Sequence, residues 1–213
     1  MIKNLIFDLD GTLYPESSGL EEECQQRVYD FFADKLNISI EDAQQVSKNL
    51  LAKYQYETQG VESELGLSEA EFLEYCCAVS TDNLVANSEL QDLLVNLPQR
   101  KFIFTDSTTS HVNDVLNKLE VDLALFDDIY DAEKGNFAYK LSSDAFVAFC
   151  NYYQINPKES IFFEDRERNL SLAKLVGFKT VLITETNVSK AEVDYCFSDI
   201  NQALKALKKD NLI

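Results

Sequence analysis

The chain has 213 residues, which is enough for one domain of good size or for one domain that carries a smaller insertion. Its 37 acidic residues outnumber 19 basic ones, and a net charge of −18 repels the phosphate backbone of DNA or RNA, so no nucleic-acid polymer is expected as a partner. Five scattered cysteines are typical of reduced thiols in the cytoplasm. No apolar run approaches the roughly 20 residues of a membrane span, and the apolar run at the start of the chain is too short for a signal peptide.

Short apolar runs predict the buried strands of a sheet. They lie at residues 5–7, 101–105, 160–164 and 179–184, with weaker edge candidates in "DDIYD" and "DYCFSD". Segments with helical spacing of apolar residues separate these runs, as at Val112, Val115, Leu116 and Leu119. Alternation of strand and helix favours an α/β fold, a doubly wound parallel sheet with helices on both faces.

The region from residue 15 to residue 87 breaks this alternation. It contains no strand candidate, and its amphipathic stretches predict helices at 20–36, at 40–54 and around "SEAEFLEYCC". The sequence therefore predicts a core domain of residues 1–14 and 88–213, interrupted by a small helical domain of residues 15–87. Four aromatic residues of this insertion are expected in its core rather than against a substrate, and for the last two contact with a substrate stays open: Phe31, Phe32, Tyr54 and Tyr56.

The segment "IFDLDGTLYP", residues 6–15, places two aspartates directly after the first predicted strand. Side chains alternate along an extended chain, so Asp8 and Asp10 are expected to project to the same side and to share one small volume. Two carboxylates at such a short distance need a positive group between them. A site is therefore predicted at this end of the strand.

Other polar residues follow the neighbouring strands. In a parallel sheet the carboxyl ends of the strands meet at one edge, where ligands bind. The residues expected there are Thr105, Asp106, Glu164 and Asp165, with Lys140 at the start of an intervening helix. Such an all-oxygen set suits Mg²⁺, and the sequence has no Cys/His spacing typical of zinc. Lys140 and the Thr105 hydroxyl would then be donors to an anion, for which phosphate is the natural choice beside magnesium.

Four motifs in order, "DLDGTLYP", "FTD", Lys140 and "FFEDRERN", resemble those of the haloacid dehalogenase (HAD) superfamily in its phosphatase branch. The stretch "FTDSTTSHVNDVLNKLEVDLALFDDIYD", which includes His111, is similar to the pyrimidine 5′-nucleotidase-like group. The resemblance implies a Rossmann-like core, with the helical insertion at the place of that family's cap domain.

The resemblance also implies a role for each matched residue. Asp8 would attack phosphorus and form an aspartyl-phosphate, and Asp10 would act as general acid and then as general base. Mg²⁺ would be held by the Asp8 carboxylate, the Asp10 carbonyl, Asp165 and, directly or through water, Glu164. The phosphoryl oxygens would be held by Thr105, the amide of Asp106 and Lys140.

Two positions depart from the family's pattern. Asp106 replaces a common asparagine, and its carboxylate would repel phosphate unless it is turned away or paired. Arg166 replaces a usual serine, where it would contact the leaving group or neutralise nearby acid. Asn169 matches the pattern. For His111, a structural or capping role is favoured over acid–base catalysis.

These observations predict a magnesium-dependent phosphomonoesterase, with a nucleoside 5′-monophosphate, preferably of a pyrimidine, as the substrate. The alternatives are a phosphatase or phosphomutase acting on another small phosphorylated metabolite, or a weakly catalytic protein that binds a phosphorylated ligand. A phospho-accepting receiver domain is disfavoured because of the large insertion, and dehalogenation because a halide leaving group needs no acid at Asp10. The sequence does not predict the oligomeric state.

Overall fold

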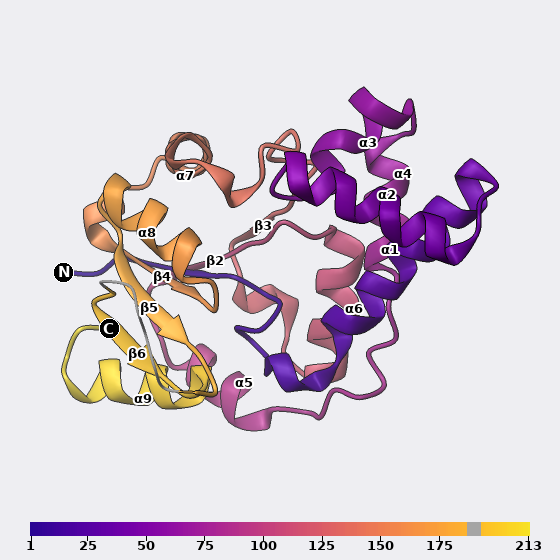
Figure 1. The fold of residues 1–213 in the computed structure, drawn as a ribbon. Helices are drawn as coiled ribbons and strands as arrows, with labels where there is room; N and C mark the ends of the chain where they lie inside the picture. Colours follow the sequence, from indigo (N-terminus) through magenta and orange to yellow (C-terminus); the bar gives the residue numbers. More distant parts are fainter. Residues whose placement is uncertain (187–192) are drawn as a thin grey trace. The chain divides into compact units, whose positions relative to one another are not determined.

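A parallel sheet forms the centre of the computed structural model, which describes residues 1–186 and 193–213 (Figure 1). Its strands in spatial order are β3 (Asp128–Tyr130), β2 (Arg100–Phe104), β1 (Asn4–Phe7), β4 (Ser160–Glu164), β5 (Lys179–Ile183) and β6 (Tyr195–Phe197). Neighbouring strands are parallel throughout the described part of the chain. The predicted α/β fold with a parallel sheet is confirmed, including both weak edge candidates.

The register explains why the strand ends meet. Phe7, the last residue of β1, pairs with Ile103 of β2 on one side and with Phe163 of β4 on the other. The residues that follow these three strands therefore emerge together at one edge of the sheet, next to its middle strand.

Helices cover both faces of this sheet. They are α5 (Ser88–Val95), α6 (Thr109–Leu119), α7 (Ser143–Tyr153), α8 (Glu167–Val176) and α9 (Ile200–Lys209), with 3-10 turns at Glu16–Ser18, Leu123–Leu125, Tyr139–Leu141 and Pro157–Glu159. Figure 1 shows α7 and α8 on one side of the sheet and α5 and α9 on the other. Phe102 and Phe104 of β2 pack against Phe146 and Phe149 of α7 in the aromatic core on the first side.

The chain divides into two compact units, each described here by itself. The core unit comprises Met1–Ser18 and Leu84–Ile213, and the helical unit comprises Gly19–Asn83. The sequence places the insertion at residues 15–87, so the observed division differs at both ends. Ser17 lies in the core unit because its amide and hydroxyl donate to Glu185 at 3.0 and 2.9 Å. Asn87 lies there because its amide donates to the Leu119 carbonyl at 2.8 Å.

The helical unit contains α1 (Leu20–Leu36), α2 (Ile40–Lys53), α3 (Thr58–Leu65) and α4 (Glu69–Cys77), with no strand in residues 19–83. Phe31 and Phe32 are fully buried and pack against Phe72, so they belong to the core of this unit. The helix α3, which is short and contains Gly60, was not predicted from the sequence. A side chain at Gly60 would meet Leu50 at 2.6 Å, so this glycine permits the close approach of α3 to α2.

The cysteines are free thiols, and burial raises the pKa of the Cys150 thiol to about 12 and that of Cys76 still further. Such thiols stay protonated and unreactive at neutral pH. The adjacent Cys76 and Cys77 are buried in the helical unit, as packing residues would be. Within residues 1–186 and 193–213, no helix has the length and apolar character needed to cross a membrane.

Candidate active site

The predicted residues gather at the edge of the sheet where β1, β2 and β4 end. Asp8 directly follows β1, Thr105 directly follows β2, and Glu164 is the last residue of β4. All three side chains are buried. Burial of two acidic groups in one place requires compensating partners, and the surrounding contacts supply them.

Lys140 lies at the centre of this cluster. Its ammonium group donates to Asp8 Oδ1, to Glu164 Oε2 at 3.0 Å and to the Phe104 carbonyl at 3.2 Å. Burial favours the neutral amine, but the charges of Asp8 and Glu164 outweigh it and raise the pKa of Lys140 well above its ordinary value. Lys140 is therefore a fixed cation between two carboxylates.

The position of Lys140 in the chain differs from the prediction. Lys140 was predicted at the start of a helix, but it lies in the 3-10 turn Tyr139–Leu141 and has non-helical backbone angles. The helix α7 begins only at Ser143. Asp106 explains this geometry, because its Oδ1 accepts a hydrogen bond from the Lys140 amide at 2.8 Å. The turn directs the lysine side chain back toward the strand ends.

The same contact accounts for the first departure from the family's pattern. The Asp106 carboxylate accepts a hydrogen bond from the backbone amide of Lys140, so it is paired, as the sequence required of a carboxylate beside phosphate. Burial raises the pKa of Asp106, and the nearby charge of Lys140 acts in the opposite direction. Thr105 accepts a hydrogen bond from the Ser107 amide at 3.1 Å through its Oγ1, which leaves the hydroxyl hydrogen to donate.

Asp8 has a second partner on its other oxygen. Thr12 Oγ1 donates to Asp8 Oδ2 at 3.2 Å, so both carboxylate oxygens are oriented. Burial and the charge of Glu164 raise the pKa of Asp8 to about 8, against the opposing effect of Lys140. The sequence analysis did not single out Thr12, although it lies in the "DLDGT" motif four residues after Asp8.

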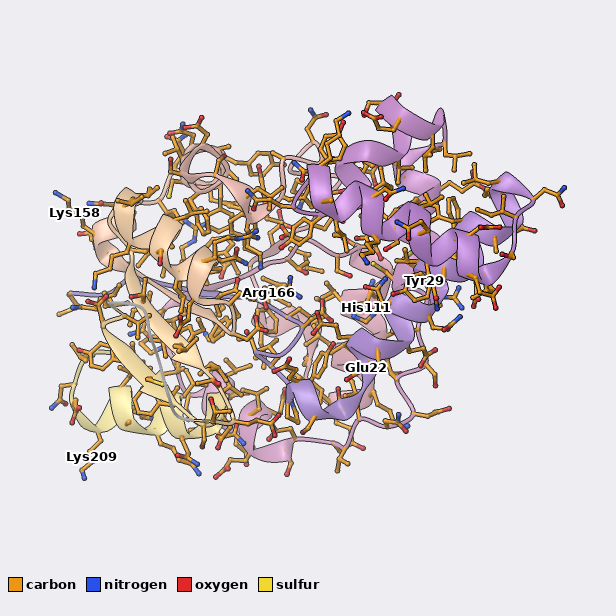
Figure 2. All side chains as sticks on the ribbon, in the orientation of Figure 1. Glu22, Tyr29, His111, Lys158, Arg166 and Lys209 are labelled. Carbon is orange, nitrogen blue, oxygen red and sulfur yellow. The ribbon has the colours of Figure 1, made fainter. Side chains whose placement is uncertain are left out.

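Glu164 is engaged on both oxygens. Oε2 also accepts from Asn169 Nδ2 at 3.0 Å, and Oε1 accepts from the Arg166 amide at 3.1 Å. These partners hold the Glu164 carboxylate beside Lys140 at the end of β4. Figure 2 labels Arg166, which directly precedes α8.

Asp165 has a side-chain oxygen that a ligand could satisfy. Its Oδ1 is buried and has no hydrogen-bond partner in the described structure. Burial, then a hydrogen bond with the Glu164 side chain and the charges of Glu164 and Asp8, raise the pKa of Asp165 to about 10. Ligand oxygens of Asp8, Glu164 and Asp165 lie within 4.8 Å of one another. A hard divalent cation would satisfy the orphaned oxygen and neutralise the crowded carboxylates, so these residues fit Mg²⁺.

Gly11 makes room for this arrangement. Its φ of +76° is the left-handed conformation that glycine tolerates, and a Cβ there would lie 2.6 Å from Asp165 Oδ2. A cavity of about 400 Å³ in the core unit borders Gly11, Thr12 and Asp165. A small ligand therefore has access to this edge of the site.

Asp10 has partners distinct from those of Asp8. His111 Nε2 lies 2.7 Å from Asp10 Oδ1, and the Tyr14 hydroxyl donates to the same oxygen. Burial opposes ionisation of Asp10, but these hydrogen bonds outweigh it and hold its pKa below the ordinary value. The sequence favoured a structural role for His111 and did not single out Tyr14, although Tyr14 follows Asp10 by four residues in the same motif.

The chain is similar to known proteins over nearly its whole length. A family model described as haloacid dehalogenase-like hydrolase matches residues 2–177. The chain is similar to a HAD phosphatase from Thermococcus onnurineus, with 22% identity over 99% of this chain and 98% of that one, and a TM-score of 0.66. It is also similar to a 2-haloacid dehalogenase from Pseudomonas syringae pv. tomato DC3000, with 15% identity, 98% and 99% coverage and a TM-score of 0.64.

A third similar structure is the HAD-hydrolase YfnB from Bacillus subtilis, solved with magnesium bound. It shares 15% identity over 97% of this chain and 99% of that one, with a TM-score of 0.62. At these identities the solved structures show a common fold, shared by phosphatases and dehalogenases. The family model covers most of the chain, and the chain therefore belongs to the haloacid dehalogenase-like hydrolases.

Proposed function

We propose that this hydrolase is a magnesium-dependent phosphomonoesterase that works through an aspartyl-phosphate on Asp8. One observation carries the proposal: Asp8 is held between the cation Lys140 and the carboxylates Glu164 and Asp165, and a buried oxygen of Asp165 lacks a partner. Such a site suits a dianionic ester that arrives with a divalent cation.

The reaction divides into two displacements. A carboxylate oxygen of Asp8 attacks phosphorus, the bond from phosphorus to the ester oxygen breaks, and Asp10 gives its proton to the departing oxygen. Asp10 then takes a proton from a water molecule, which attacks the same phosphorus and breaks its bond to Asp8. Inorganic phosphate leaves, and both aspartates return to their starting states.

The remaining residues orient and neutralise. The three donors of Lys140 contact Asp8, Glu164 and the Phe104 carbonyl, and one of them would turn to a phosphoryl oxygen as negative charge develops there. The Thr105 hydroxyl and the Asp106 amide would bind the other phosphoryl oxygens. When bound, Mg²⁺ would be held by Asp8, Asp165, the Asp10 carbonyl and Glu164, and it would offset the negative charge of the phosphoryl group and the carboxylates. Asp106 positions Lys140 through the contact with its amide.

Dehalogenation is the second candidate, because 2-haloacid dehalogenases are among the similar structures. In that reaction Asp8 would attack carbon and expel a halide, which needs neither a proton nor a divalent cation. Asp10 with its two hydrogen-bonding partners and the orphaned oxygen of Asp165 would then have no purpose. These two features favour the phosphatase.

The proposed substrate is a small phosphorylated metabolite, specifically a nucleoside 5′-monophosphate with a pyrimidine base. Its support is the resemblance of residues 104–131 to the nucleotidase-like group, since the core residues bind only the phosphoryl group. The helical unit would select the leaving group. Tyr54 and Tyr56 are the two rings of that unit to test for contact with a base, and Tyr54 donates to Glu64 at 2.7 Å within the unit.

The test is a substrate panel assayed for inorganic phosphate in the presence of magnesium. Uridine and cytidine monophosphates should be cleaved faster than sugar phosphates, with nucleoside as the second product. Equal or slower cleavage of the nucleotides would remove the nucleotidase assignment and leave the phosphatase. Release of halide from 2-chloropropionate with no phosphate release from any ester would favour the second candidate, and isomerised phosphate ester without free phosphate would indicate a phosphomutase.

A further inference from the structure

We infer that Tyr14 and His111 are a pair of positioning residues that hold Asp10 in place as the general acid for the leaving group. The inference rests on the proposed function and assigns a role to two side chains that lie outside the metal cluster. Both contacts are to Asp10 and both use its Oδ1. Neither partner occupies Oδ2, so that oxygen can carry the proton to the leaving group.

Tyr14 reaches Asp10 through the local fold of the chain. β1 ends at Phe7, and the chain then turns, with hydrogen bonds from the Thr12 and Leu13 amides to the Leu9 carbonyl at 3.2 and 3.0 Å. A turn of this kind brings side chains four residues apart to the same side. The Tyr14 side chain is buried, so its ring packs in the core unit while the hydroxyl meets the carboxylate.

His111 reaches Asp10 from a different element. It lies in the first turn of α6, where the Thr108 side chain accepts a hydrogen bond from the His111 amide at 3.2 Å. This cap fixes the backbone from which the imidazole projects. The ring is buried, with 5% of its side chain exposed, whereas Asp10 is half-buried. Two donors from separate rigid supports thus fix one carboxylate that is open on its other side.

The arrangement predicts a specific kinetic defect. A general acid matters most when the leaving oxygen is strongly basic, as in an alkyl phosphate, and least when the leaving group is stable as an anion, as in 4-nitrophenyl phosphate. A misplaced acid should therefore reduce kcat/KM selectively for poor leaving groups. The parameter kcat/KM reports the steps through departure of the leaving group, so later hydrolysis of the aspartyl-phosphate does not obscure the effect.

The test compares Tyr14→Phe, His111→Leu and His111→Gln with the wild type on a series of aryl and alkyl phosphates in magnesium. We expect Tyr14→Phe and His111→Leu to lose roughly ten- to a hundredfold in kcat/KM on the alkyl phosphate and less than about threefold on 4-nitrophenyl phosphate. His111→Gln keeps a donor near the Nε2 position and should recover much of the loss.

Two controls accompany these variants. Asp10→Asn removes the general acid itself and should therefore show the largest dependence of kcat/KM on the leaving group. Tyr153→Phe removes a hydroxyl that donates to Asp128 at 2.9 Å in the same unit, and it should leave the leaving-group dependence unchanged. If His111→Leu fails to fold, Tyr14→Phe and His111→Gln still decide the matter.

The outcomes separate the inference from the function on which it rests. An active wild type with variants that lose equally on all substrates, or lose nothing, would overturn the positioning role alone. A wild type that cleaves no phosphate ester would overturn the proposed function and this inference together. A leaving-group effect confined to the Asp10, Tyr14 and His111 variants would establish the pair.

Discussion

Replacement of Gly11 by alanine tests the placement of Asp165, on which the proposed metal site depends. The Cβ of Gly11→Ala would lie 2.6 Å from Asp165 Oδ2, so the carboxylate must retreat by about 0.8 Å to reach an ordinary contact of 3.4 Å. Metal ligands are placed to within roughly 0.2 Å, so this displacement is several times what the site accepts. The same substitution also strains the backbone, because φ is +76° at this position.

The two effects have different sizes and different readouts. A left-handed conformation costs a residue with a side chain about 1–2 kcal/mol of folding free energy, which urea denaturation would measure. Displacement of the ligand should raise the magnesium concentration for half-maximal activity at least about tenfold. It should also lower kcat/KM by roughly a hundredfold, because the reacting groups are no longer aligned. Phosphate release from 4-nitrophenyl phosphate over a magnesium titration measures both parameters.

Gly177→Ala is the matched control within the core unit. Gly177 ends α8 with φ of +113°, so alanine is strained there too, but the new Cβ would make only an ordinary contact, 3.5 Å from Lys158. We expect lower stability with wild-type magnesium dependence. If Gly11→Ala needed the same magnesium concentration for half-maximal activity as the wild type, Asp165 would not be a metal ligand whose position depends on its contact with Gly11. Equal kinetic losses in both variants would trace the defect to backbone strain.

Three further predictions concern catalysis, metal and stability. Asp8→Asn should lower phosphate release at least about a thousandfold, equivalent to roughly 4 kcal/mol of barrier, because an amide does not attack phosphorus, and retention of a tenth of the activity would exclude Asp8 as nucleophile. A chelator should abolish turnover and magnesium, but not zinc, should restore it, so full activity in excess chelator would reject the metal assignment. Partial burial raises the pKa of Asp194, but hydrogen bonds from Thr180 and Lys174 outweigh this effect and hold that pKa below its ordinary value of 3.8. The stabilisation by the Asp194 carboxylate is therefore lost as the pH falls through the folded-state pKa, and Asp194→Asn should lower the melting temperature at pH 7 more than near pH 3. An equal effect at both pH values would contradict this prediction.

The strands could be predicted because each is an apolar run, and the parallel arrangement then places their ends at one edge. Asp8, Thr105 and Glu164 follow from that rule alone. Lys140 does not, because its side chain returns to the site from a turn whose shape depends on Asp106, a residue 34 positions earlier. The sequence indicated Lys140 by its position between the "FTD" and "FFEDRERN" motifs, but assigned it to the start of a helix. The short helix α3 was missed for a local reason, since its glycine interrupts the apolar periodicity.

Asp10 shows where the sequence rule for strands stops. Alternation along an extended chain predicts that Asp8 and Asp10 share one volume, but β1 ends at Phe7 and Asp10 lies in the turn that follows. The charge of Asp10 still raises the pKa of Asp8, so the two carboxylates remain electrostatic neighbours. Their hydrogen-bonding partners, however, are separate.

This separation gives two chemically similar groups different tasks. Asp8 is buried beside Lys140, whose charge lowers the pKa of this carboxyl but is outweighed by burial and by Glu164. A divalent cation bound at Asp8 would favour the anion that a nucleophile must be. Asp10 is half-buried, and its Oδ1 meets the Tyr14 hydroxyl and the His111 imidazole, which hold its pKa below the ordinary value. Asp10 can therefore lose and regain a proton on Oδ2 while Oδ1 keeps its two partners. Protonation of Asp8, in contrast, would leave the buried Lys140 with one carboxylate fewer. The protonated form that a general acid needs would be favoured at Asp10 by the negative charge of a phosphoryl group bound beside it. The separate partners thus distinguish the two carboxyl groups, and the proposed mechanism assigns Asp8 as nucleophile and Asp10 as acid and base.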